Sequence, residues 1–263
     1  MTDRKRRHLD NAVAAVQQRY GPQALHYGDL FNPIQEIPHI STGFPALDAM
    51  TGCLGVPAGA VTLLSGRTTS GKVTVAYKLL ANAQRTVYGQ IAYTVALIDL
   101  SRTADPDYLA RCGIDLHYLL VARPERPEQA IAVLGDLLQL QRPRAVVVDG
   151  LPQLVADRTA LGRLNEMLGK LVQLARTTGC ALVFLDDPKP PWQRWFNLDG
   201  SRTVRWRAAL HIELQRERWL RRDNEMAGYQ AQARLLKSRW VHALRSAEVE
   251  IVFNGTVRAR ETW

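Results

Sequence analysis

One short glycine-containing segment constrains the fold of this chain more than any other feature. It reads Gly66, Arg67, Thr68, Thr69, Ser70, Gly71, Lys72, Val73 and Thr74. An apolar run, residues 60–65, precedes it, and a helical pattern begins at Lys72. A phosphate loop requires this order of strand, loop and helix, because the glycines permit a tight turn, backbone N–H groups surround phosphate oxygens, and the lysine reaches the terminal phosphates. The segment therefore predicts a nucleotide-binding α/β fold.

The middle of the chain alternates between strand-like and helical patterns. After the loop, strands are expected at 94–100, 118–121, 145–148 and 181–185, and helices at 72–85, 106–111, 127–140 and 160–177. Such alternation indicates crossover units and a buried, mostly parallel sheet with flanking helices. Three later strand-like runs, 208–214, 229–236 and 249–253, are separated by Arg-rich segments that we expect to be turns. They predict an antiparallel extension of the sheet.

The N-terminal residues predict a helical arm in front of this core. Residues 4–20 carry an apolar stripe at helical spacing, and a Gly-Pro pair ends the pattern. The stripe consists of Leu9, Val13, Val16 and Tyr20. A proline-containing linker follows, so we divide the chain into an oligomerisation arm, 1–39, and a core, 40–263. Because the stripe has to be buried, we expect it to pack either on its own core or on a neighbouring subunit.

The charge balance points to an anionic partner. Lys and Arg total 34 against 25 Asp and Glu, which gives a net charge of +9 and a pI near 9.8. Such a balance favours nucleic acid, nucleotide or a membrane surface, although it also fits a solvated surface that only aids solubility. No apolar run approaches the ~18 residues of a membrane span, and the basic N-terminus leads into no signal sequence, so no membrane association is expected. Three widely spaced cysteines add to the expectation of a cytoplasmic protein.

The loop departs from its usual pattern at Val73, where a Ser or Thr hydroxyl normally ligates Mg²⁺. Thr74 follows, but one residue along a helix points about 100° away. Mg²⁺ would then depend on Asp149, which follows the strand at 145–148, together with water and the oxygens of the nucleotide. Two interpretations remain open: the loop binds nucleotide with weak or no hydrolysis, or it only shapes the fold.

Several motifs, in order, resemble the bacterial RecA recombinase family over about residues 8–257. They are YGPQALHYGD after the arm helix, ISTGFPALDAMTGCLGVPAGAVTLLSGRTTSGKV at 40–73, IDLSRTADPDYLARCGID at 98–115, VVVDG, LVFLDD, LLKSR and SAEVEIVFNG. The resemblance implies a RecA-type phosphate-loop NTPase core behind a polymerisation arm. It also implies a divergent paralogue, because the separate C-terminal domain of typical RecA proteins is expected to be missing from a chain that ends at Trp263.

Carried over residue by residue, the resemblance implies that the ATP site is kept. Asp105 would accept a hydrogen bond from adenine, and Tyr108 would stack on the base. Asp149 matches the metal-associated aspartate of the family. Lys237 and Arg239 match two basic residues that reach the ATP of a neighbouring subunit. The expected cofactors are therefore ATP and weakly bound Mg²⁺.

The same resemblance implies that the catalytic chemistry is lost. The glutamate that activates water in the family falls at Ser101, and a serine hydroxyl cannot act as a general base near neutral pH. The nucleotide-sensing glutamine falls at Asp187, whose negative charge would repel a γ-phosphate unless it is paired. Asp187 and its neighbour Asp186 form an acidic pair without an evident partner for acid–base work. No catalytic residue is thus expected to be intact, and whether the protein is an enzyme stays open.

Residues 188–207 correspond to a loop that holds single-stranded DNA near the filament axis in RecA. Aromatic rings stack on unpaired bases and cations contact phosphates, so a segment rich in both favours single-strand binding. The candidate contacts are Lys189, Trp192, Arg194, Trp195, Phe196, Arg202, Arg205 and Arg207. The alternative is that the tryptophans pack the loop on the core or form a protein interface. A first loop, at about 151–162, is a weaker candidate and contributes Arg158.

Three functions are compatible with the sequence. The leading hypothesis is a RecA-like protein that binds ATP and single-stranded DNA in DNA repair, recombination or the damage-induced (SOS) response, with weak or no ATP hydrolysis. It would associate with itself or with RecA through the arm. The second hypothesis is an active, DNA-dependent ATPase recombinase, and the third is a pseudo-ATPase adaptor that recruits a DNA polymerase in a mutagenesis complex.

Overall fold

The computed structural model describes residues 3–22, 24–25, 37–85, 89–187, 201–222 and 225–252. The chain forms two compact units, 1–36 and 37–263. The first contains helix α1 (Asp3–Tyr20), which confirms the helix expected in the arm. Along its apolar stripe Val13 is buried and Val16 half-buried, whereas Leu9 and Tyr20 are exposed.

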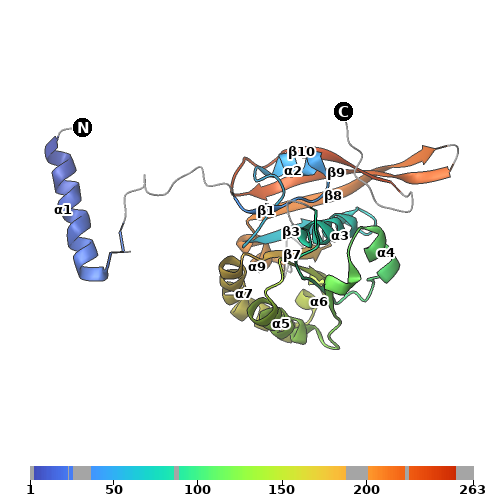
Figure 1. Ribbon diagram of the computed structural model, residues 1–263, viewed down its shortest axis with the longest axis horizontal. Coiled ribbons are helices and arrows are strands. Elements are labelled where there is room, and N and C mark those ends of the chain that lie inside the picture. The colour runs from blue at the N-terminus through green and yellow to red at the C-terminus, as the bar shows by residue number, and fades with distance from the viewer. Residues whose placement is uncertain are drawn as a thin grey trace. The chain divides into compact units, whose positions relative to one another are not determined.

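An eight-stranded sheet forms the centre of the second unit (Figure 1). Its order is β10-β9-β8-β3-β7-β6-β4-β5, and all neighbours from β8 to β5 run parallel. These parallel strands are β3 (Val61–Ser65), β4 (Val95–Asp99), β5 (Leu119–Ala122), β6 (Ala145–Asp149), β7 (Ala181–Asp186) and β8 (Leu210–Arg222). Strands β9 (Glu225–Ser238) and β10 (Ser246–Val252) add an antiparallel extension. The predicted α/β architecture is therefore confirmed.

Helices cover both faces of this sheet. They are α2 (Pro45–Thr51), α3 (Lys72–Ala83), α4 (Pro106–Arg111), α5 (Pro127–Asp136), α6 (Leu151–Ala156), α7 (Arg158–Thr178) and α9 (Arg202–Arg207). A small antiparallel sheet of β1 (His39–Ile40) and β2 (Val56–Pro57) precedes β3 in the chain. Within the described ranges, no helix is both long and apolar enough to span a membrane.

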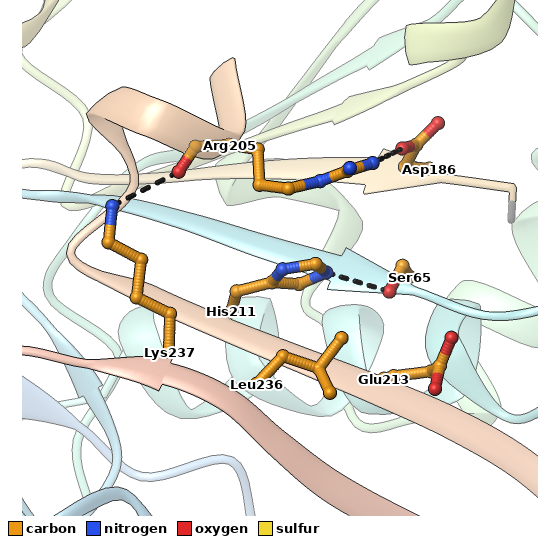
Figure 2. Close-up of a pocket in the computed structure, with 7 residues that line it drawn as sticks. All are labelled: Ser65, Asp186, Arg205, His211, Glu213, Leu236 and Lys237. Carbon is orange, nitrogen blue, oxygen red and sulfur yellow. Dashed lines mark hydrogen bonds and ion pairs between the residues drawn. The ribbon is translucent and has the colours of Figure 1, made fainter. Parts of the chain in front are cut away.

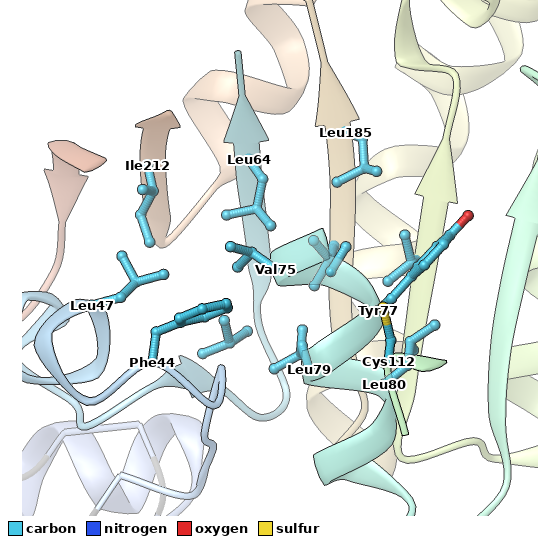
Figure 3. Close-up of a cluster of buried hydrophobic side chains, with 14 of the residues drawn as sticks. Phe44, Leu47, Leu64, Val75, Tyr77, Leu79, Leu80, Cys112, Leu185 and Ile212 are labelled. Carbon is cyan, nitrogen blue, oxygen red and sulfur yellow. The ribbon is translucent and has the colours of Figure 1, made fainter. Parts of the chain in front are cut away.

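Successive residues of the central strands point to opposite faces and so build two hydrophobic clusters. Leu64 lies in one cluster with Val75 and Leu79 of α3, where Phe44 also packs (Figure 3). Leu63 lies in the other cluster, which contains the buried faces of α5, α6 and α7. Because both faces are covered, β3, β4, β6 and β7 are buried along their whole length. This is why the sequence shows them as nearly continuous apolar runs.

Three local predictions are wrong. Residues 216–222 are not a turn, because β8 and β9 form one long hairpin in which each strand satisfies the backbone hydrogen bonds of the other. Residues 151–162 are not a loop, because α6 fills their first half and the side chain of Asp157 caps the first turn of α7. Residues 202–207, expected in a loop, form α9, which the buried Val204 anchors.

Candidate functional site

The phosphate loop lies between the carboxyl end of β3 and the first residue of α3, Lys72. Two of its glycines are needed, Gly71 for its backbone conformation and Gly66 for close packing. A Cβ on Gly71, whose φ is +95°, would lie 2.7 Å from Cδ1 of Ile251. A Cβ on Gly66 would lie 2.5 Å from the backbone oxygen of Leu214. Strands β8 and β10 thus pack directly on the loop and restrict its shape.

The loop borders a pocket of about 330 Å³. The pocket is lined by Arg67, Thr68, Thr69, Ser70, Gly71, Lys72, Val73, Thr74, Ser101, Thr103, Tyr108, Asp149, Asp187 and Tyr229. The structure therefore places Tyr108 and Asp149 beside the loop. Asp105 lies outside this lining, because its side chain caps α4 by accepting from the N–H of Asp107 at 3.0 Å.

Lys72 already has an acidic partner. Its ammonium group donates to the backbone oxygen of Gly66 at 2.7 Å and forms an ion pair with Asp187, which follows β7. The lysine side chain is 10% exposed and the aspartate side chain 54% exposed. The sequence left open whether Asp187 is paired, and the structure shows this ion pair. A phosphate group entering the loop has to compete with the Asp187 carboxylate for Lys72.

Ser101, the residue expected in place of a catalytic glutamate, links two carboxylates. Its Oγ lies 2.9 Å from Oδ2 of Asp149, 3.1 Å from Oδ1 of Asp99 and 2.7 Å from Oγ1 of Thr103, and its one proton can go to only one of these acceptors. Burial raises the pKa of Asp149, and the hydrogen bond from Ser101 opposes that rise. Asp99 is paired with Arg123, whose Nε donates to Oδ2 at 2.9 Å. The hydroxyl of Ser101 thus forms hydrogen bonds within the site and does not act as a general base.

Thr74 does not replace the hydroxyl that Val73 lacks. Its Oγ1 forms a hydrogen bond with Oη of Tyr108 on α4. Tyr108 is half-buried and packs at a tilt on Tyr77, with ring centroids 5.8 Å apart. Burial raises the pKa of the Tyr108 phenol. The phenol therefore stays protonated at neutral pH, and the Thr74 hydroxyl is engaged in a hydrogen bond with it.

A second pocket, of about 270 Å³, lies beside the carboxyl ends of β3 and β7. It is lined by Ser65, Asp186, Arg205, His211, Glu213, Leu236 and Lys237 (Figure 2). Lys237 donates to the backbone oxygens of Arg205 at 3.1 Å and Trp206 at 2.8 Å, at the carboxyl end of α9. Burial, and secondarily the charge of Arg239, lower the pKa of Lys237. Within one chain, Lys237 and Arg239 therefore lie outside the lining of the phosphate-loop pocket.

The predicted DNA contacts fall into three groups. Lys189, Trp192, Arg194, Trp195 and Phe196 lie outside the described residues. Arg202 and Arg207 on α9, and Arg158 at the start of α7, are exposed. Arg205, on α9, is half-buried, and its Nη2 lies 3.1 Å from Oγ of Ser201 and 3.9 Å from Oδ2 of Asp186, so its role as a DNA contact stays a prediction. Its guanidinium is directed at the second pocket, and it gives Asp186 the partner that the sequence did not reveal (Figure 2).

Sequence reasoning missed Arg216 and Tyr229, which reach the loop from β8 and β9. Nη1 of Arg216 donates to Oγ1 of Thr69 at 2.8 Å, and Tyr229 lines the pocket. The Arg216 contact spans 147 positions of the sequence, and no local motif marks it. The sequence offers one signal for Arg216. Alternate residues of a strand share a face, and Ile212, Leu214 and Arg216 are two positions apart.

A mostly parallel sheet with a central strand that runs into a phosphate loop defines the class of this protein as a phosphate-loop α/β core. The sequence matches the RecA N-terminal domain family over residues 7–185, and the chain belongs to this family. It is similar to Protein RecA of Frankia alni, with 28% identity over 267 residues that cover 95% of this chain and 75% of that protein. Protein RecA of Pseudomonas fluorescens is 25% identical over 270 residues, which cover 96% of this chain and 75% of that protein. The resemblance predicted from the motifs is thereby confirmed.

Proposed function

We propose that this protein binds ATP and single-stranded DNA and acts in DNA repair or recombination, with weak or no ATP hydrolysis. Membership of the RecA N-terminal domain family supports the DNA-related role. The observation that carries the nucleotide part is the loop itself, in which the ammonium of Lys72 is held at Gly66. Val73 and Ser101 replace the two side chains that hydrolysis needs, and the described lining of the pocket contains no glutamate to activate water.

ATP would bind with its phosphates in the loop. Backbone N–H groups of residues 67–72 and the ammonium of Lys72 would contact the phosphate oxygens after Asp187 releases the lysine. Tyr108 lines the same pocket and offers an aromatic surface to adenine. Mg²⁺ fits this site poorly, because Val73 has no side-chain oxygen and Asp149 is bonded to Ser101.

DNA binding is supported by the charge of the chain and by the surface of α9. The net charge is +9, and Trp206 on α9 is 73% exposed between the exposed Arg202 and Arg207. An exposed indole can stack on an unpaired base while nearby guanidinium groups contact phosphates. The preceding residues, 188–200, supply the remaining proposed contacts.

Self-association, or association with RecA, would use the arm. The exposed Leu9 and Tyr20 of α1 are apolar side chains that a partner surface would cover. Lys237 and Arg239 would then approach the nucleotide of a neighbouring subunit. A cytoplasmic location belongs to the same proposal, and it agrees with cysteines at 53, 112 and 180 that are buried free thiols.

An adaptor function is the second candidate, and the ion pair between Lys72 and Asp187 favours it. A loop whose lysine is already neutralised can keep the fold of an ATPase without bound nucleotide. In that case Trp206 and its neighbours would contact a protein, such as a DNA polymerase, instead of bases. An active recombinase has less support, because it would need another route to activate water than Ser101 offers.

Three measurements on the full-length protein test the proposal. Calorimetry measures ATP binding, with Lys72→Ala as the variant that disables the loop. Fluorescence anisotropy measures binding of a labelled single-stranded oligonucleotide, and a phosphate-release assay measures ATP turnover with and without that oligonucleotide. We expect both ligands to bind, with turnover far below that of RecA in the same buffer. Folded protein that binds neither ligand would favour the adaptor, and RecA-like turnover would establish the recombinase.

A further inference from the structure

The loop offers few side-chain oxygens to Mg²⁺, which usually binds through one or two carboxylates, the substrate phosphates and water. Val73 contributes no side-chain oxygen, and the hydroxyl of Thr74 is bonded to Tyr108. Asp149 is 7% exposed, and its carboxylate lies 2.9 Å from the hydroxyl of Ser101.

Arg216 brings a second cation to the loop. Its Nη1 donates to Oγ1 of Thr69 at 2.8 Å. The pairing of β8 with β9 shifts register between Arg216 and Arg218, and a bulge of this kind changes the direction of the side chains beside it. Trp219 supports the guanidinium, with Cζ 4.4 Å from the ring centroid, and Tyr229 packs edge-on against Trp219 at 5.8 Å. The arginine is therefore held beside the phosphate loop by contacts on two sides.

The charge of Arg216 is available to a ligand at once, whereas Lys72 first has to be released by Asp187. Lys72 is paired with Asp187, but Arg216 forms no ion pair with any residue in the described ranges. A guanidinium has five N–H donors in a planar fork that matches phosphate oxygens. One of these donors is used at Thr69, and the face of the group lies on Trp219, so most donors remain for a phosphate.

We propose that the loop binds its nucleotide as the metal-free di- or triphosphate, and that Arg216 supplies in cis the positive charge that Mg²⁺ usually supplies. This inference rests on the proposed ATP binding and adds the form of the ligand and the residue that selects it. Arg216 contacts the phosphates from β8, while Lys72 and the backbone N–H groups contact them from the loop. The affinity for ATP is then nearly independent of Mg²⁺.

The test is a calorimetric titration of the full-length protein with ATP, once with Mg²⁺ and once with EDTA. The two Kd values should differ by less than about threefold, because Val73 has no side-chain oxygen for a metal ion and the Thr74 hydroxyl is bonded to Tyr108. Arg216→Gln should weaken ATP binding roughly 10- to 100-fold in both buffers, the range expected for losing a hydrogen bond to a charged group.

Arg221→Gln is the matched control, because it removes the same charge from an exposed position of the same strand. It should leave the affinity for ATP unchanged in both buffers. Arg216→Lys keeps the charge and the packing stem but loses the planar fork, so it should recover part of the binding that Arg216→Gln loses. Circular dichroism of each variant shows that it is folded before titration.

The outcomes separate three claims: that the protein binds ATP, that binding does not need Mg²⁺, and that Arg216 contacts the phosphates. Binding that requires Mg²⁺ overturns the inference and leaves the proposed ATP binding intact. If Arg216→Gln weakens ATP binding no more than Arg221→Gln does, the role of Arg216 is overturned. No binding in either buffer, with folded protein, refutes the proposed ATP binding and the inference together.

Discussion

Replacing Asp187 by asparagine should strengthen nucleotide binding and weaken the nucleotide-free fold. The carboxylate forms an ion pair with the buried Lys72, and asparagine keeps the size of the side chain but removes its charge. In the wild-type protein a phosphate has to displace Asp187 from Lys72. In the variant the lysine is free of that competitor before the nucleotide arrives.

The size of the effect follows from the exposure of the two side chains, 10% for Lys72 and 54% for Asp187. An ion pair that is open to water on one side contributes up to about 1 kcal/mol. Repulsion between the Asp187 carboxylate and a phosphate about 4 Å away adds about 1 kcal/mol at the dielectric constant of water. The sum, about 1–2 kcal/mol, corresponds to roughly 5- to 30-fold tighter binding of ATP.

Calorimetry of ATP binding to the wild-type protein, Asp187→Asn and Glu217→Gln measures this effect. Glu217 is exposed on β8, so its replacement controls for the change in net charge. Without nucleotide, Asp187→Asn should lower the Tm by about 2–4 °C, which is the shift expected for a loss of about 1 kcal/mol in a chain of this size. If Asp187→Asn binds ATP no more tightly than Glu217→Gln does, the idea that Asp187 and phosphate compete for Lys72 is refuted.

Four further predictions concern stability, assembly and DNA. Asp149→Asn should raise the Tm at neutral pH, because burial raises the pKa of the native carboxyl above its ordinary 3.8. The native state thus binds this proton more tightly than the unfolded state, so thermal melts should show the advantage of the variant shrinking as the pH falls towards 3.8. Deleting residues 1–36 should leave a folded core that light scattering shows as a smaller assembly, with fewer chains per particle than the full-length protein. An unfolded core would mean that the arm packs on its own chain. Trp192→Ala with Trp195→Ala should cost roughly 2–6 kcal/mol of single-strand affinity at every salt concentration if both rings stack. Arg194→Gln with Arg202→Gln should instead lower the log–log salt slope by about 1–1.5 if both contact phosphate, and unchanged anisotropy in both double variants would favour a protein interface.

The parallel part of the sheet could be predicted from the sequence because its signal is local. Strand β3 is buried on both faces from Val61 to Ser65, so its residues form one apolar run that stands out from the polar loop after it. The phosphate loop is equally local, since its glycines and Lys72 lie within a few positions of one another. Neither feature depends on residues far away in the sequence, so each could be recognised from its own segment.

The hairpin and the ion pairs could not be predicted, because their partners lie far away in the sequence. Beyond Leu214, β8 is mostly polar and exposed, and it is a strand because β9 pairs with it rather than because of its own residues. Lys72 and Asp187 are 115 positions apart, and Arg216 and Thr69 are 147 apart. Composition fixes how many charges the chain has but not which cation meets which anion.

The last described strand packs beside the phosphate loop, since Cδ1 of Ile251 on β10 lies where a side chain at position 71 would be. Chains are synthesised from the N-terminus, so the loop and α3 leave the ribosome long before β10 does. Until β10 pairs with β9, nothing from that strand supports Gly71. A nascent or prematurely terminated chain therefore carries the complete phosphate-loop sequence before Ile251 packs beside Gly71.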